Sequence, residues 1–271
     1  MAGADALSAP STPAASQLGS RIIVGVCLAA IAVADIWIGG PAFALMVAVF
    51  VCLVFWEWGT MHGLPAHLRW LGVCILLAAS ALTALDKPVS GLTLLLGATG
   101  AFLILSAMAK LPGKRWISTG LLYAGLPAVA LIWLRGQPDG FALVMWTMAI
   151  VWATDVAAYF AGRAIGGPKL WPAISPNKTW AGLVGGATAA GIFSALFGSF
   201  VGWAQSPILL FAMGAALACV AQAGDFFESW LKRRAGVKDS GSLLRAHGGI
   251  MDRVDGLVPV ACVVGLWVAL R

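Results

Sequence analysis

Residues 42–60 read AFALMVAVFVCLVFWEWGT, a continuous apolar run whose only charged side chain is Glu57. A helix needs about 20 mostly apolar residues to cross a bilayer, so this stretch predicts a membrane-spanning helix. Hydropathy predicts nine such spans along the chain, near residues 22–39, 42–60, 70–85, 91–109, 117–134, 141–162, 182–203, 207–226 and 252–270. The sequence therefore predicts an all-α, polytopic transmembrane helical protein of about nine spans with no large soluble domain.

The composition of the chain agrees with this fold class. Of its 271 residues, 61% are hydrophobic and 10% are charged, whereas a soluble domain has roughly 45–50% and 25%. A water-soluble globule is therefore excluded. The five cysteines all fall in apolar runs without close-pair spacing, which is typical of small buried side chains rather than of disulfides or zinc ligands.

The basic residues are distributed unevenly between the two sets of loops that these spans create. Fourteen of the 17 lysines and arginines lie on the side of the N-terminus, and only Lys87, Arg135 and Arg271 lie opposite. Cytoplasmic loops carry such an excess, so the pattern predicts a protein of the cytoplasmic (inner) membrane with a cytoplasmic N-terminus. The cytoplasmic loops are then 61–69, 110–116, 163–181 and 227–251. The net charge of +6 is explained by topology and gives no indication of nucleic-acid binding.

The chain divides into three regions. Residues 1–20, rich in Ala, Ser and Pro, are expected to form a disordered tail. Residues 21–140 are expected to be a transmembrane scaffold, in which Asp35 and Glu57 lie near span ends and reach interfacial water. This scaffold is expected to carry little chemistry. Residues 141–271 are the expected catalytic transmembrane region, with the active site facing the cytoplasm.

Four acidic residues of the last region stand at the cytoplasmic ends of predicted spans. Asp155 is near the end of the sixth span, Asp225 ends the eighth, and Asp252 and Asp255 open the ninth. Carboxylates at membrane depth are costly and indicate function. Asp252 and Asp255 are three residues apart and are expected on one helical face. Together with Asp225 they would supply hard oxygen ligands for Mg²⁺.

Two cationic segments accompany these acids. Residues 228–251 read ESWLKRRAGVKDSGSLLRAHGGIM, and residues 155–182 read DVAAYFAGRAIGGPKLWPAISPNKTWAG. Lysines and arginines beside carboxylates are typical of a site for a metal and a nucleotide. Two simpler interpretations are salt bridges, with Arg233 and Arg253 neutralising the acids, and attraction of the basic loop to anionic lipid.

These segments also carry a family resemblance. The residues Ser229-Trp-Leu-Lys232-Arg233, then Lys238-Asp239, then His247-Gly-Gly-Ile-Met-Asp252-Arg253-Val-Asp255 resemble the C-terminal motif of phosphatidate cytidylyltransferases, or CDP-diacylglycerol synthases. The upstream set Asp155, Tyr159, Gly162, Arg163 and Ser175-Pro-Asn-Lys178-Thr-Trp180 resembles that family's other cytoplasmic segment. The detailed resemblance covers about residues 150–257. Two positions depart from the pattern, Arg245 before the His-Gly-Gly turn and Ala181 after Trp180.

The resemblance implies transfer of the cytidylyl group of CTP to phosphatidic acid, which gives CDP-diacylglycerol and pyrophosphate for phospholipid biosynthesis. It implies Mg²⁺ at Asp225, Asp252 and Asp255, with Asp155 as a further candidate, and catalytic roles for these three acids, Lys238 and His247. The implied substrate-binding residues are Arg163, Ser175, Lys178, Lys232, Arg233, Asp239 and Arg253. For His247 a structural role in the turn is an equal alternative. A second cation and a homodimer stay open.

Three other functions fit parts of the pattern. A CTP-dependent lipid-alcohol kinase has similar needs, but the long match from Ser229 to Asp255 argues against it. A cation-coupled membrane transporter would use intramembrane carboxylates, yet these acids gather at one membrane face and no internal repeat is evident. A catalytically weakened scaffold is suggested only by Arg245 and Ala181.

Overall fold

A computed structural model describes residues 30–108, 114–241 and 249–271. The predicted tail, residues 1–20, lies outside the described residues. Residues 30–38 are helical, and they are followed by the helices α2 (Gly40–Met61), α3 (Ala66–Ala84), α4 (Pro88–Met108), α5 (Lys114–Arg135) and α6 (Gly140–Ala164). The chain continues through β1 (Lys169–Trp171), β2 (Ser175–Thr179), α7 (Trp180–Phe200), α8 (Pro207–Arg234), a short 3-10 helix (Met251–Arg253) and α9 (Leu257–Ala269).

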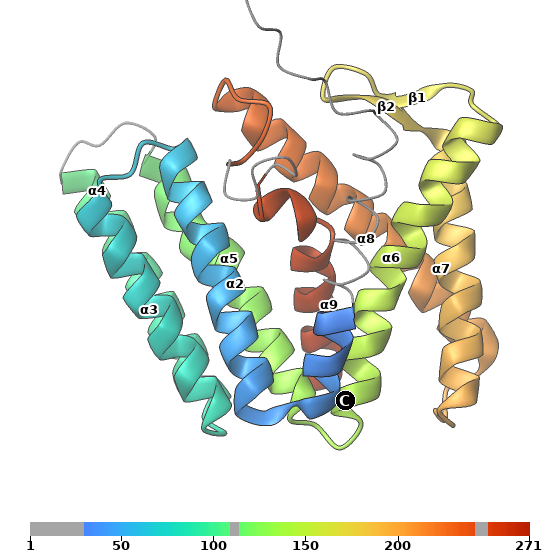
Figure 1. The fold of residues 1–271 in the computed structure, drawn as a ribbon, viewed down its shortest axis with the longest axis horizontal. Helices are drawn as coiled ribbons and strands as arrows, with labels where there is room; N and C mark the ends of the chain where they lie inside the picture. Colours follow the sequence, from blue (N-terminus) through green and yellow to red (C-terminus); the bar gives the residue numbers. More distant parts are fainter. Residues whose placement is uncertain (1–29, 109–113, 242–248) are drawn as a thin grey trace, which may run out of the picture.

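The helices run alternately up and down in one bundle (Figure 1). In this view α3 and α4 form one flank and α7 the other, while α9 lies near the centre. α9 packs against α5, α6 and α8. The β1–β2 hairpin and the C-terminus lie at opposite ends of the bundle. We call the end that carries β1 and β2 the hairpin end.

Seven helices of the described chain are long and apolar enough to cross a membrane, which confirms the polytopic all-α class. They match the second to eighth predicted spans. The first predicted span begins outside the described residues. The ninth was expected at 252–270, but its helix starts only at Leu257 and has 13 residues. Asp252 and Asp255 therefore do not share the face of a regular α-helix, because one belongs to the 3-10 helix and the other to the turn after it.

Two of the loops that the sequence predicts to be cytoplasmic are more ordered than expected. The predicted loop 227–251 begins as helix, since α8 continues to Arg234. Glu228, Lys232 and Arg233 are therefore positioned on a helix. The predicted loop 163–181 contains the antiparallel hairpin, in which Lys169 pairs with Thr179 and Trp171 with Ser175. These regular elements bring the cations of both segments to defined places.

Small residues let α6 and α7 approach closely. A Cβ added to Gly182 would meet the carbonyl oxygen of Ala158 at 2.9 Å, and one at Gly186 would meet that of Thr154 at 2.9 Å. Gly182 and Gly186 thus form a small-xxx-small step, a spacing that lets two helices pack closely. Thr179 caps α7 by accepting a hydrogen bond from Gly182 N at 3.1 Å. The cap fixes the hairpin, including Lys178, over the end of α6.

The four cysteines in the described chain, Cys52, Cys74, Cys219 and Cys262, are free. This agrees with the expectation that they form no disulfide. Cys74 and Cys219 are exposed on the surface of the bundle rather than buried in it, so the expected burial is wrong for these two residues.

Candidate active site

Between α8 and α9 the chain re-enters the helix bundle. The 13 residues of α9 span about 20 Å at 1.5 Å per residue, against about 30 Å for the hydrocarbon core. The preceding residues 249–256, which we call the re-entrant segment, lie below the upper ends of α2 and α8 (Figure 1). Ile250 and Met251 are buried there. Irregular backbone at such a depth requires protein groups to satisfy its N–H donors.

Glu57 of α2 provides these partners. Its Oε1 accepts a hydrogen bond from Ile250 N at 3.0 Å, and its Oε2 accepts from Met251 N at 2.9 Å and from Ser240 Oγ at 3.1 Å. The residue is 2% exposed. The expectation that Glu57 reaches interfacial water is therefore wrong, because Ser240 and residues 249–251 cover its carboxylate.

Asp252 is the second acceptor of the re-entrant segment. Its Oδ1 accepts from Lys232 Nζ at 2.6 Å. Its Oδ2 accepts from Gly249 N at 2.8 Å and from Ser240, through the amide at 3.2 Å and the hydroxyl at 3.1 Å. Burial favours the neutral acid, but hydrogen bonds to Glu228, Lys232 and Gly249 hold the pKa of Asp252 below its usual range. Asp252 is thus an ionised carboxylate already supplied with donors.

Lys232 joins Asp252 to α8. Its Nζ lies 2.8 Å from Glu228 Oε2, one helical turn earlier, and 2.6 Å from Asp252 Oδ1. Glu228 is 1% exposed, and its Oε1 has no hydrogen-bond partner among the described residues. One ammonium group therefore holds the buried carboxylate of Glu228 and the partly exposed carboxylate of Asp252 together.

Lys178 makes a second set of contacts, between β2 and α8. Its Nζ forms an ion pair with Asp225 Oδ2 and donates to Gln222 Oε1 at 2.9 Å. It also lies 4.8 Å from the centre of the Phe226 ring, a cation–π distance. The hairpin thus brings a cation of the upstream motif to the acid that the sequence places at the end of the eighth predicted span.

Asp255 belongs to this second set. Burial is the main cause that raises its pKa to about 7, and the charges of Asp225 and Asp155 add to the effect, while Lys178 opposes it. Gly224 lets α8 approach the backbone at Asp255 closely, because a Cβ at position 224 would collide with the Asp255 carbonyl oxygen and with Pro259. The neighbourhood of Asp255 therefore has more negative charge than its cations balance.

A cavity of about 570 Å³ opens beside Lys178. Asp155 and Asp225 line it together with Arg163, Lys169 and Lys178. Arg163 donates from Nη1 to Tyr159 Oη at 2.9 Å. The upstream segment and the end of α8 at Asp225 thus share one cavity that has both carboxylates and cations on its walls.

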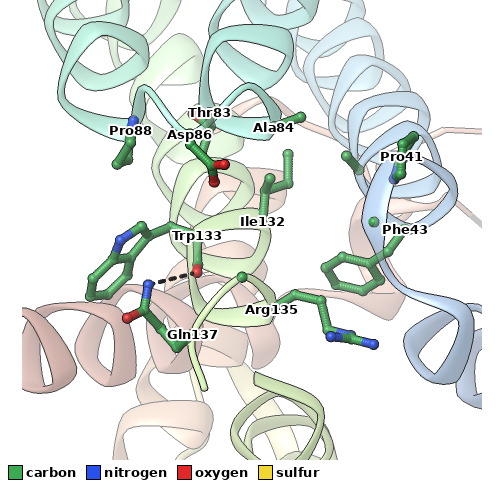
Figure 2. A pocket seen from close by; sticks show the side chains of 13 residues that line it. Pro41, Phe43, Thr83, Ala84, Asp86, Pro88, Ile132, Trp133, Arg135 and Gln137 are labelled. Atoms are coloured by element: carbon green, nitrogen blue, oxygen red, sulfur yellow. Dashed lines mark hydrogen bonds between the residues drawn. The ribbon is translucent and has the colours of Figure 1, made fainter. Parts of the chain in front are cut away.

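A second cavity, of about 400 Å³, lies at the end of the bundle opposite the hairpin (Figure 2). Asp86, Arg135 and Gln137 are among the residues that line it. Arg135 points away from Asp86 in this view and donates to Ile36 O at 2.7 Å and to Trp37 O at 3.1 Å. Because its arginine is used to join two helical segments and neither motif reaches it, this cavity is not the candidate site.

The expected metal-binding trio is not assembled around one point. Among the residues that the structure describes, no group of three His, Cys, Asp or Glu side chains is placed to hold one ion. Asp225 contacts Lys178, whereas Asp252 contacts Lys232. The salt-bridge alternative named Arg233 and Arg253 as the partners of the acids, whereas the ion pairs at Asp225 and Asp252 are formed by Lys178 and Lys232.

Two of the acids nevertheless fit a magnesium site. Mg²⁺ is usually bound by one or two carboxylates, with waters and substrate phosphates filling its other positions. Asp225 and Asp255 provide hard oxygen donors whose mutual charge is only partly neutralised by Lys178. Asp252, with four donors, has no similar need for a cation.

The other predicted site residues lie around these contacts. Arg233, Lys238, Asp239 and Arg253 are exposed at the hairpin end, and Ser175 begins β2. His247 lies outside the described residues. Glu57, Glu228 and Gln222 were missed by sequence reasoning. For Glu57 the signal was present, since a single charge inside a long apolar run indicates a function.

These features define an integral membrane protein whose bundle carries, at one end, carboxylates paired with lysines beside a basic cavity. Comparison with known proteins specifies the class further. Residues 19–270 match the model of the cytidylyltransferase family. The chain is 41% identical over 264 residues to the phosphatidate cytidylyltransferase of Brucella suis, with 94% of each chain covered. It is 35% identical over 267 residues to that of Pseudomonas aeruginosa, covering 93% of this chain and 98% of the relative.

The chain therefore belongs to the cytidylyltransferase family. The match extends over nearly the whole chain rather than over the two motifs alone, and the family resemblance predicted from the motifs is confirmed.

Proposed function

We propose that the protein transfers the cytidylyl group of CTP to phosphatidate and forms CDP-diacylglycerol and pyrophosphate. The observation that carries this proposal is the similarity over 94% of both chains to curated phosphatidate cytidylyltransferases. The site supports it, because Arg163, Lys169 and Lys178 meet the carboxylates of Asp155 and Asp225 at one cavity. A reaction between two anionic phosphates requires such cations to offset their repulsion.

In the reaction an oxygen of the phosphatidate monoester attacks the α-phosphorus of CTP. A new P–O bond forms, and the bond from the α-phosphorus to the bridging oxygen breaks, so that pyrophosphate leaves with the electron pair. The monoester is largely ionised near pH 7, since its second pKa is about 6, and needs no strong general base. Lys178, Lys169 and Arg163 bind phosphate oxygens in the cavity.

The proposal assigns Mg²⁺ to Asp225 and Asp255, and Asp155 lines the cavity together with Asp225. When bound, the metal offsets charge on the phosphates during the transfer. Asp252 and Lys232 hold the re-entrant segment against α8, and the exposed Arg233, Lys238 and Arg253 attract the triphosphate. His247 stays a candidate for orienting a phosphate.

The test of the reaction is an assay of the purified protein in detergent with phosphatidate, Mg²⁺ and CTP labelled at either the α- or the γ-phosphate. We expect the α-label in a CDP-lipid and the γ-label in pyrophosphate. Transfer of the γ-label to lipid would instead indicate a lipid kinase. No labelled lipid from either substrate would contradict the proposal.

We also propose that the hairpin end faces the cytoplasm of an inner membrane, so that CTP arrives from solution and lipid enters from the bilayer. The charge asymmetry supports this orientation. An impermeant thiol reagent should label Lys238→Cys only after permeabilisation and Arg271→Cys in intact cells, relative to the unsubstituted chain. The reverse pattern would contradict the orientation.

A further inference from the structure

The re-entrant segment depends on a residue that both motifs leave out. Glu57 belongs to α2, 183 residues before Ser240 and 194 before Met251 in the chain. Its three hydrogen-bond donors are two backbone amides and one hydroxyl of the segment from Ser240 to Met251. Glu57 is therefore the point at which the N-terminal helices hold the chain that carries Asp252 and Asp255.

The packing around Glu57 leaves no space for another arrangement. A Cβ on Gly241 would lie 2.5 Å from Glu57 Oε1, and a Cβ on Gly249 would lie 2.6 Å from Glu57 Oε2 and would overlap Ser240 Oγ. Real Cβ atoms do not approach so closely. The glycines therefore allow the backbone on both sides to close around the carboxylate, and the position of the segment is fixed by Glu57.

Ser240 connects this anchor to Asp252. Its hydroxyl lies 3.1 Å from both Glu57 Oε2 and Asp252 Oδ2. A hydroxyl has one proton, so it cannot donate fully to both carboxylates at once. Lys232 neutralises Asp252 on the far side. A change at Glu57 is therefore transmitted through Ser240 to Asp252, and from there along the segment to Asp255.

We propose that Glu57 is a positioning residue for cytidylyl transfer, which fixes the re-entrant segment that carries Asp252 and Asp255. The inference rests on the proposed function for its activity readout. Glu57 touches backbone and Ser240 rather than reacting groups, so it acts through the placement of the acids. Groups that orient metal ligands affect metal affinity or activity by about 10- to 100-fold when they are replaced.

The central variant is Glu57→Gln, which keeps the size of the side chain but turns one acceptor into a donor that faces a backbone N–H. We expect kcat to fall by about 10- to 100-fold, the half-saturating Mg²⁺ concentration to rise, and the KM for phosphatidate to stay nearly constant. Glu57→Asp keeps both acceptors on a shorter side chain and should recover part of the loss. Ser240→Ala, which removes only the bridging hydroxyl, should show the same effects in weaker form.

The matched control is Ser194→Ala. Ser194 is also fully buried between helices, accepting from Trp146 Nε1 at 2.9 Å and donating to Leu210 O at 2.6 Å, but it lies outside the site. Its replacement should lower the Tm without changing the Mg²⁺ dependence. A purely structural Glu57 would behave in the same way.

A readout independent of catalysis is Mn²⁺ binding to the protein alone, measured by electron paramagnetic resonance. Glu57→Gln should bind Mn²⁺ about tenfold or more weakly than the wild type. The inference is overturned if Glu57→Gln retains wild-type Mn²⁺ binding, or if its activity loss only follows Tm as in Ser194→Ala. A wild-type protein that binds Mn²⁺ but forms no CDP-lipid would contradict the proposed function instead, and the Mn²⁺ comparison would still test the positioning role.

Discussion

Asp252 and Asp255 stand three residues apart in one short segment, but their surroundings differ. Asp252 accepts four hydrogen bonds. Burial alone would raise its pKa, but hydrogen bonds to Glu228, Lys232 and Gly249 hold the pKa below its usual range. Asp255 accepts one from its own neighbour Gly256, and burial beside Asp225 raises its pKa to about 7. The comparison indicates that one acid of the motif holds the chain, while the other has few hydrogen-bond partners within the protein.

Two lysines of the site, Lys232 and Lys178, differ in a similar way. Lys232 connects Asp252 to Glu228 within the protein, whereas Lys178 contacts Asp225 and lines the cavity. A ligand that enters the cavity meets Lys178 and Asp225, but it does not need to break the contacts of Asp252. Four variants test this difference between the two acids and their surroundings.

The largest effect is expected from Asp255→Asn. Asparagine keeps the size but removes the charge that would offset Mg²⁺, and losing a main electrostatic interaction costs about 10²–10³ in rate or more. Since the replaced carboxylate stands among like charges, the Tm should stay the same or rise. CDP-lipid formation and a thermal melt measure the two quantities. A near wild-type rate across a Mg²⁺ titration would mean that Asp255 is not a ligand.

Asp252→Asn should also reduce activity severely, but with the opposite effect on stability. The change weakens the pair with Lys232 and replaces an acceptor by a donor opposite the amides of Ser240 and Gly249. Leaving such groups without partners costs about 1–3 kcal/mol, so the Tm should fall. An unchanged Tm would contradict the role of Asp252 in holding the segment.

Gly249→Ala should produce a smaller, mainly structural loss. The added Cβ overlaps Ser240 Oγ and crowds Glu57, and overpacking of this kind costs about 1–3 kcal/mol. Gly97→Ala is the matched control, because nothing lies within 4 Å of its Cβ. If both variants melt at the wild-type temperature, the close packing around Glu57 is not real.

The smallest effect is expected from Asp35→Asn. Asp35 lies in the helical stretch 30–38, at the end of the bundle away from the hairpin, and its buried Oδ2 has no partner among the described residues. Removing its charge should change the rate less than about twofold, because charges beyond a Debye length of roughly 10 Å are largely screened. A large loss would show that the site extends through the membrane.

Much of the molecule follows from local sequence patterns. Long apolar runs predict spans directly, since backbone groups must be satisfied within each helix in lipid. The ends of the spans identify Asp225, and the motifs identify Lys178 and Asp255. The pairing of acids with particular lysines could not be predicted, because Lys178 meets Asp225 only through the fold of the hairpin. The end of α8 was also missed, since Lys232 and Arg233 look like loop residues when only hydropathy is counted.

The contacts of Glu57 could not be predicted from the sequence for a different reason. Its place in an apolar run was visible, but its partners are backbone amides 193 and 194 residues away in the chain, and backbone amides have no sequence signature. The re-entry of residues 249–256 was hidden for the same reason, because its apolar continuation in α9 looks like one uninterrupted span. Contacts between the scaffold and the motif region therefore had to come from the structure.

The different roles of Asp252, which holds the segment, and Asp255, which is proposed to bind the metal, are tested most directly by Mn²⁺ binding in the absence of nucleotide. The proteins compared are the wild type, Asp252→Asn and Asp255→Asn. Hard oxygen ligands accept Mn²⁺ in place of Mg²⁺, and electron paramagnetic resonance reports the free ion. We predict that Asp255→Asn loses specific binding, while Asp252→Asn binds about 10- to 100-fold more weakly because its segment is displaced. Loss of binding in Asp252→Asn with retention in Asp255→Asn would contradict the account.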